Sequence, residues 1–142
     1  MSRPLHMRHN FPAIEALEAA GIDPASVQVV APGVDLERLL VREASSLLEK
    51  LVLRRNAAIA LPYVVYMHSR WYRRPRAQLA RLVIHEAVHV SQWRQTGNLK
   101  YAATYAFDYL RGRLRRRGHD EAYQQIRYEV QAREATDKVL PR

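Results

Sequence analysis

Cysteine is absent from this chain of 142 residues. Without thiols, the chain cannot form disulfides, thiolate metal sites or a cysteine nucleophile. Any metal ion that it binds must therefore be held by nitrogen and oxygen ligands. The lack of cysteine leaves the redox compartment open.

Long hydrophobic runs are also absent. No segment approaches the ~18 consecutive apolar residues of a membrane span. Residues 1–10 carry positive charge without the apolar stretch of a signal peptide, so we expect a soluble, cytoplasmic protein. Hydrophobic residues make up 48% and charged residues 26%, as in ordinary globular proteins. The length predicts one domain, residues 1–142, of unspecified oligomeric state.

The net charge of +9 is concentrated in one half of the chain. Residues 1–69 contain seven Lys or Arg and seven Asp or Glu, so the excess lies in residues 70–142. We interpret the basic clusters first as solvated helix ends and loops. The alternative is that they attract nucleic acid, an acidic protein or an anionic membrane surface. The clusters are Arg70, Arg73, Arg74 and Arg76, and then Arg111, Arg113, Arg115, Arg116 and Arg117.

Hydrophobic periodicity and turn residues predict a mainly α fold of the α+β type. Helices are expected at 13–20, 35–54, 76–96, 99–117 and 120–139, with a brief helical turn after Asp23. Residues 1–55 would then be an N-terminal helical segment. Residues 57–68 are rich in β-branched and aromatic side chains and are interrupted by Pro62, which indicates a short hairpin or an edge strand.

The most specific pattern is the pentad His85-Glu86-Ala87-Val88-His89, inside the expected helix 76–96. On a helix, a spacing of four residues brings two imidazoles to one face, where they can bind one zinc ion. The intervening Glu86 then lies beside the open coordination position. Three polar groups within five residues of an apolar stretch would be costly to bury without a metal.

Catalytic zinc usually has three protein ligands, so a third must come from elsewhere in the chain. The metzincin pattern would need glycine and histidine at Gln92 and Gln95, which excludes that class. Among the downstream carboxylates we favour Glu129, because it lies on an inward stripe with the small Ala132. The other candidates are Asp108, Asp120, Glu121 and Glu134, with His119 as a nitrogen alternative; Asp108 better suits the role of orienting a histidine.

With these residues the chain resembles the gluzincin branch of the zincin metallopeptidases, and more narrowly the small bacterial single-domain zincins. The resemblance covers about residues 57–138. It implies a zincin-like helical bundle at 56–142, with the short hairpin or edge strand before the active-site helix at 76–96. It also implies a third-ligand helix at 120–139. The ligands of Zn²⁺ would be His85, His89 and Glu129, and Glu86 would be the general base.

The chemistry expected of such a site is peptide hydrolysis. Zinc acidifies a water molecule and polarises the scissile carbonyl, and Glu86 transfers the proton to the leaving amine. A second donor to the oxyanion is usually a tyrosine or histidine. Tyr123 and His119 are the candidates, and we take Tyr123 as the catalytic one.

Two other functions compete with a peptidase acting on a peptide or protein. One is an inactive zincin-like binding module with a structural metal, whose basic face contacts nucleic acid or an acidic protein. We favour a peptide substrate over nucleic acid, because charge alone specifies no partner. The other is a latent enzyme in which residues 1–34 lie across the cleft.

Overall fold

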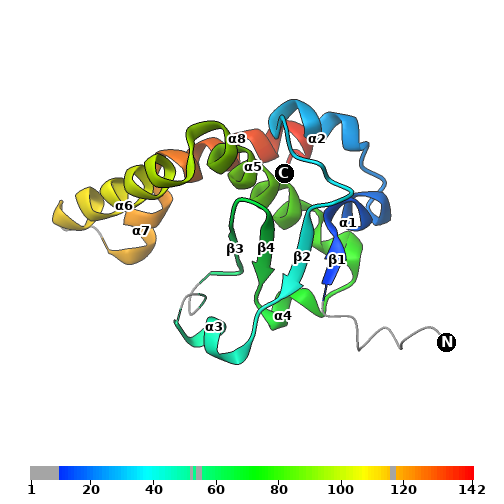
Figure 1. The fold of residues 1–142 in the computed structure, drawn as a ribbon, viewed down its shortest axis with the longest axis horizontal. Coiled ribbons are helices and arrows are strands. Elements are labelled where there is room, and N and C mark those ends of the chain that lie inside the picture. The colour runs from blue at the N-terminus through cyan, green and yellow to red at the C-terminus, as the bar shows by residue number, and fades with distance from the viewer. Residues whose placement is uncertain (1–9, 52, 54–55, 116–117) are drawn as a thin grey trace.

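The computed structural model describes residues 10–51, 53, 56–115 and 118–142 (Figure 1). Helices dominate these residues and a small sheet accompanies them, so the predicted mainly α, α+β class is confirmed. The strands are β1 (Asn10–Pro12), β2 (Leu40–Glu43), β3 (Ala58–Ala60) and β4 (Val64–Met67). The helices are α1 (Ala13–Ala19), α2 (Pro24–Val30), α3 (Ser46–Leu51), α4 (Ser69–Tyr72), η2 (Arg76–Leu79, a 3₁₀ turn), α5 (Ala80–Thr96), α6 (Asn98–Leu114), α7 (His119–Gln124) and α8 (Arg127–Val139).

The strands form one mixed sheet in the order β1-β2-β4-β3. β2 pairs antiparallel with β1 and parallel with β4, while β3 and β4 form an antiparallel hairpin. This hairpin is the extended segment that the sequence predicted around Pro62. β3 is one of the two edge strands of this sheet, and it lies against α5.

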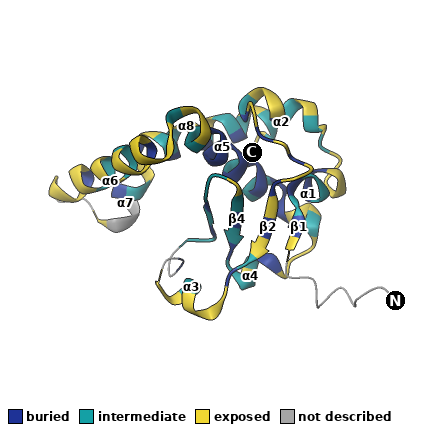
Figure 2. Cartoon of the chain, viewed as in Figure 1, coloured by how far each residue is buried: buried dark blue, intermediate teal, exposed yellow. Residues whose placement is uncertain are grey.

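The core lies between the sheet and α5, and α8 covers the other side of that helix (Figure 1). Val83, Ile84, Ala87 and Val90 of α5 are almost completely buried. Figure 2 shows α5 as the most buried helix of this view. The segment with the histidine pair is therefore held rigidly by packing on both faces.

The predicted continuous helix at 35–54 is wrong, and the described residues of the predicted helical segment 1–55 contain the strands β1 and β2 as well as short helices. Residues 35–39 form turns, then β2 and the short α3 follow. β2 pairs with β1 on one side and with β4 on the other. Val41 is fully buried while Leu40 and Arg42 are exposed, because successive side chains of a strand point to opposite faces of the sheet. Leu47 and Leu51, which suggested a helical stripe, are 66% and 72% exposed. Strand pairing overrides the helical periodicity of the leucines.

The predicted single helix at 120–139 is also divided in two. α7 ends at Gln124 and α8 begins at Arg127, with the buried Ile126 in an extended conformation between them. Asp108 of α6 accepts hydrogen bonds from the backbone nitrogen of Arg127 at 3.2 Å and from its guanidinium at 2.7 and 2.8 Å. These bonds satisfy an otherwise unpaired donor in the first turn of α8 and fix where that helix starts.

Among the described residues, no helix combines the length and apolar character needed to cross a membrane.

Gly112 sets the distance between α6 and α7. A Cβ atom at this position would lie 3.0 Å from the Cβ and 3.1 Å from the Cα of Ala122, which is fully buried. Only glycine allows the two helices to pack this closely.

We therefore predict that Gly112→Val lowers the free energy of unfolding by about 1–3 kcal/mol through overpacking. The matched control is Ala103→Val, which places a valine at an exposed position of the same helix. Urea unfolding of both variants measures the effect. Equal stability of the two variants would contradict the close packing of α6 and α7. Helix propensity alone would favour the Gly112 variant, because valine is a better helix former than glycine.

Candidate metal centre

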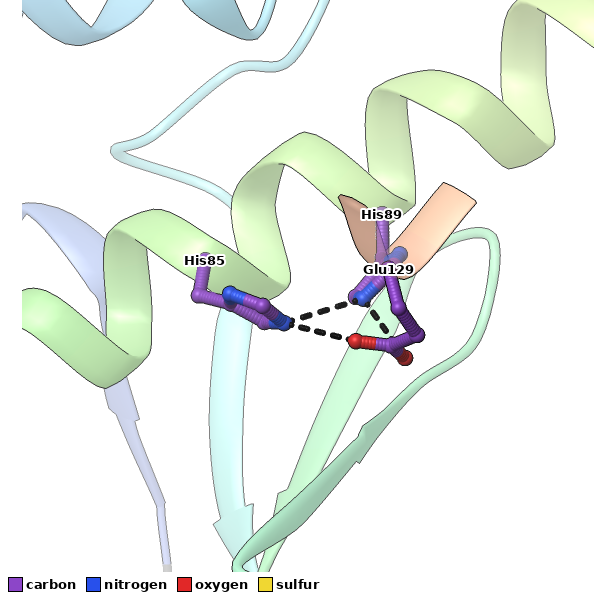
Figure 3. A group of neighbouring side chains, drawn as sticks. All are labelled: His85, His89 and Glu129. Atoms are coloured by element: carbon purple, nitrogen blue, oxygen red, sulfur yellow. Dashed lines mark hydrogen bonds and ion pairs between the residues drawn. The ribbon is translucent and has the colours of Figure 1, made fainter. Parts of the chain in front are cut away.

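His85 and His89 lie one turn apart on α5 and point to the same side (Figure 3). Their Nε2 atoms are 3.2 Å apart, and their rings meet edge to face with centroids 4.8 Å apart. His89 is buried, whereas the side chain of His85 is 19% exposed. One imidazole is thus fixed in the core and the other borders solvent.

Glu129, in the first turn of α8, completes the cluster. Its Oε2 lies 3.0 Å from Nε2 of His85, and its Oε1 lies 3.0 Å from Nε2 of His89 (Figure 3). One ligand atom from each of the three residues lies within 4.8 Å of the others. Ala132, fully buried one turn further on, lets α8 approach α5. The group could hold a metal ion.

The cluster is strongly coupled electrostatically. Burial opposes ionisation of Glu129, but hydrogen bonds from His85 and His89 outweigh it and hold the pKa of Glu129 below its ordinary value. Burial likewise opposes charging of His89, but Glu129 raises the pKa of His89 to about 9. A metal ion must compete with this proton, since only a neutral imidazole can be a ligand.

Gln92 orients His89 from one turn further along α5. The Nδ1–H of His89 donates to Oε1 of Gln92 at 2.7 Å, and Nε2 of Gln92 donates to the Tyr128 carbonyl at 3.0 Å. With its NH₂ group so engaged, the glutamine presents its oxygen to the imidazole. This fixes the tautomer that leaves Nε2 of His89 free for a metal. The hydroxyl of Tyr101 also lies 3.1 Å from Nδ1.

Sequence reasoning missed this role, because Gln92 served only to exclude the metzincin pattern. The available signal was its position three residues after His89, on the same face of the helix.

Two tyrosines contact the cluster from α6 and α7. Tyr105 donates a hydrogen bond to Oε1 of Glu129 at 2.9 Å. Tyr123 meets Tyr105 edge to face with centroids 6.4 Å apart, and it borders both cavities beside the cluster. Burial, followed by the charges of Glu129 and Glu86, raises the pKa of Tyr123, so its hydroxyl stays protonated. Of these two tyrosines, the sequence analysis named only Tyr123.

Glu86 is 4% exposed and lies on the same helix as the histidines. Burial raises its pKa, the histidines lower it, and the charge of Glu129 raises it; the net direction is upward. A carboxylate in this environment is a stronger base than one in water. Glu86 lines both cavities, so it can reach a molecule bound in either.

Two cavities meet at the cluster. The larger, about 950 Å³, extends past His85 towards Gln78 and Arg133. The smaller, about 350 Å³, is mostly apolar and extends past His89 between β3 and α6. Strand β3 borders both. No residue of 10–34, the described part of the segment proposed to cover the cleft, lines either one.

Of the other third-ligand candidates, those whose side chains the structure describes lie outside this cluster. Asp108 binds Arg127 instead of orienting a histidine, so that prediction is wrong. Glu134 is exposed on α8 and lines the larger cavity, and Glu121 is exposed on α7. His119 and Asp120 lie in the first turn of α7, but their side chains fall outside the described part of the chain.

The arginines before α5 are partly used inside the fold. Arg76 forms an ion pair with Glu15 at 3.3 Å and donates to the Tyr72 carbonyl at 3.1 Å. The guanidinium of Arg74 lies 3.7 Å from the ring centroid of Trp71. At least two of the four arginines in the first basic cluster therefore have partners within the fold. Arg116 and Arg117 of the second cluster lie outside the described residues.

Comparison with protein-family models, with curated proteins and with solved structures found no match for this chain.

The geometry predicts that Glu129→Ala lowers the affinity for zinc by at least ~100-fold, since it would remove one of the three candidate ligands. The matched control is Glu134→Ala, which removes an exposed carboxylate from the same helix. Competition with a chromophoric chelator measures both affinities. Equal zinc binding by the two variants would exclude Glu129 as a ligand and direct attention to His119.

Gln92→Leu is predicted to lower zinc affinity by ~10–100-fold, because His89 loses the acceptor that fixes its tautomer. Gln95→Leu is the control: its amide donates to Ser91 at 3.0 Å on another side of α5. The same chelator competition applies. Unchanged affinity in the Gln92 variant would mean that Tyr101 alone orients the imidazole.

Proposed function

We propose that the protein is a zinc-dependent metallopeptidase of the gluzincin type. The observation that carries this proposal is the convergence of His85, His89 and Glu129 within 4.8 Å, beside the buried Glu86. A purely structural metal site is usually closed by four protein ligands, whereas three ligands beside a cavity are typical of catalytic zinc.

The chemistry of the donor set fits zinc. Two neutral imidazoles and one carboxylate match the ligands of known zinc peptidases. The same set also holds iron in some oxygenases, but a buried carboxylate next to the ligands is suited to proton transfer in hydrolysis. When bound, zinc supplies a Lewis acid and lowers the pKa of water at the site.

Glu86 is proposed as the general base. Its burial keeps competing water away, and its raised pKa makes it an effective acceptor for the proton of the attacking water. The same carboxyl group then donates that proton to the amine that leaves. Access to both cavities supports this role, because the scissile bond would lie where the cavities meet.

Tyr123 is proposed to donate a hydrogen bond to the oxyanion that develops on the scissile carbonyl. Its raised pKa keeps the donor protonated, and it borders both cavities next to Glu86. Tyr105 is proposed to orient a ligand, because its hydroxyl donates to Glu129 at 2.9 Å. The hydroxyl of Tyr123 also interacts with Glu129 and Tyr105.

An extended peptide is the substrate class that β3 suits. The backbone of Leu61 donates to the Val64 carbonyl, and the Ala57 carbonyl accepts from the backbone of His68. In an antiparallel pair only every second residue turns its backbone N–H and C=O towards the neighbouring strand, so in β3 the odd-numbered residues bond to β4. The backbone of Ala58 and Ala60 then faces the cleft, and Trp93 donates to the Ala60 carbonyl at 2.8 Å. Ala58 is left to pair with a substrate backbone, as in other cases of strand addition.

The smaller cavity favours an apolar residue beside the scissile bond. Its walls include Ile59, Trp93, Tyr101 and Tyr109, with the small Ala102 and Ala106 leaving room between them. At about 350 Å³ it has space for a large hydrophobic or aromatic side chain. The larger cavity is more polar and more open, so it would accept a wider range of substrate side chains.

The proposal predicts that Glu86→Gln keeps zinc affinity but lowers peptide hydrolysis by ~10²–10⁴-fold, because it removes only the base. Zinc-loaded wild-type and variant proteins are incubated with a diverse peptide mixture, and mass spectrometry measures cleavage. A fully active variant would exclude this mechanism. A zinc-loaded wild-type protein that cleaves nothing would contradict the peptidase and favour a binding module.

A further inference from the structure

Helix α6 presents an unusual outer face. Four large apolar side chains are largely exposed there: Leu99 by 85%, Phe107 by 60%, Leu110 by 56% and Leu114 by 75%. With the exposed Ala103 they recur every three or four residues, which places them on one side of the helix. We call these five residues the apolar stripe. In Figure 2 the helix lies at one end of the molecule, away from the sheet, and is mostly exposed.

The stripe is not the face that α6 uses for folding. Tyr101 stacks between Trp93 and Tyr128, with centroids 4.2 and 4.6 Å away, and Tyr105 binds Glu129. Gly112, on that same inner side, contacts α7. Because successive residues turn by about 100°, these inner positions lie opposite the stripe. Helix α7 therefore does not lie over the stripe.

Positive charge borders the stripe on both sides. At about 100° per residue, Lys100 and Arg111 fall next to Phe107, and Arg113 falls beyond Leu99 on the other border. All three cations are exposed. The acidic residue of this helix, Asp108, is bound to Arg127 and points away from the stripe.

We propose that α6 docks the protein on an anionic lipid bilayer. An apolar face bordered by Lys and Arg is the arrangement of helices that lie in the membrane interface, with the cations reaching up to lipid phosphates. The charge favours this occupant over a second copy of the chain. Two stripes packed together would bring the cations of both copies into contact, and α6 has no carboxylate on either border to compensate them.

Docking through α6 does not depend on the proposed peptidase activity. The helix is about 25 Å long at 1.5 Å per residue, and a flat bilayer can contact its whole outer face without a complementary groove. The smaller cavity is lined by Tyr101, Tyr105 and Tyr109 on the inner side of α6 and by Ala102 and Ala106 on one flank, and no residue of the apolar stripe lines either cavity.

Vesicle flotation of the full chain tests the proposal. The protein should float with phosphatidylcholine vesicles that contain about a third phosphatidylserine, and far less with phosphatidylcholine alone or at high salt. The double variant Phe107→Ser/Leu110→Ser and the charge variant Lys100→Glu/Arg113→Glu should each weaken partitioning by at least ~10-fold. The matched control, Leu47→Ser/Leu51→Ser, removes two exposed leucines from α3 and should bind like the wild type.

Four results would overturn the proposal. They are no flotation of the wild type, equal binding to neutral vesicles, binding unaffected by the Phe107/Leu110 variant, and equal loss in the α3 control. Sedimentation equilibrium distinguishes the main rival: a dimer that Phe107→Ser/Leu110→Ser abolishes, without vesicle binding, would make the stripe a self-association surface. Circular dichroism checks that each variant is folded, which is expected because the substituted side chains are exposed.

Discussion

The arrangement of the candidate metal centre depends on the carboxylate of Glu129, which lies between two imidazoles. A buried charge is costly unless it is paired, and here both oxygens are within 3.0 Å of a histidine nitrogen. This ties the start of α8 to the middle of α5. Two further anchors hold α8 in place: Asp108 binds Arg127 at its beginning, and Arg81 binds Asp137 at 2.8 Å near its end.

The same arrangement accounts for the surroundings of the centre. With α5 and α8 fixed, α6 and α7 bring Tyr105 and Tyr123 to one side, and β3 forms the border of the cleft. The aromatic inner face of α6 thus serves both packing and the orientation of Glu129 and His89, the proposed ligands. Its outer face remains free for the membrane docking that we propose.

The sequence patterns predicted those features that depend on residues close together in the chain. The pentad specified both histidines and Glu86, because helix geometry alone sets their spacing. The composition of residues 57–68 indicated the hairpin, and the inward-facing helical pattern that includes Ala132 indicated Glu129. Partners distant in sequence determine the rest. Val41 is in a strand because β1 and β4 flank it, and α8 starts where Asp108 caps it. The role of Gln92 depends on the Tyr128 carbonyl, which periodicity cannot reveal.

Zinc K-edge X-ray absorption of the metal-loaded protein tests the central claim most directly. The account predicts one zinc ion per chain, directly coordinated by two imidazoles, with oxygen atoms completing the coordination. A third imidazole, which would bring in a histidine such as His119, would contradict the assignment of Glu129. Failure of the folded protein to take up zinc would contradict the metal centre itself.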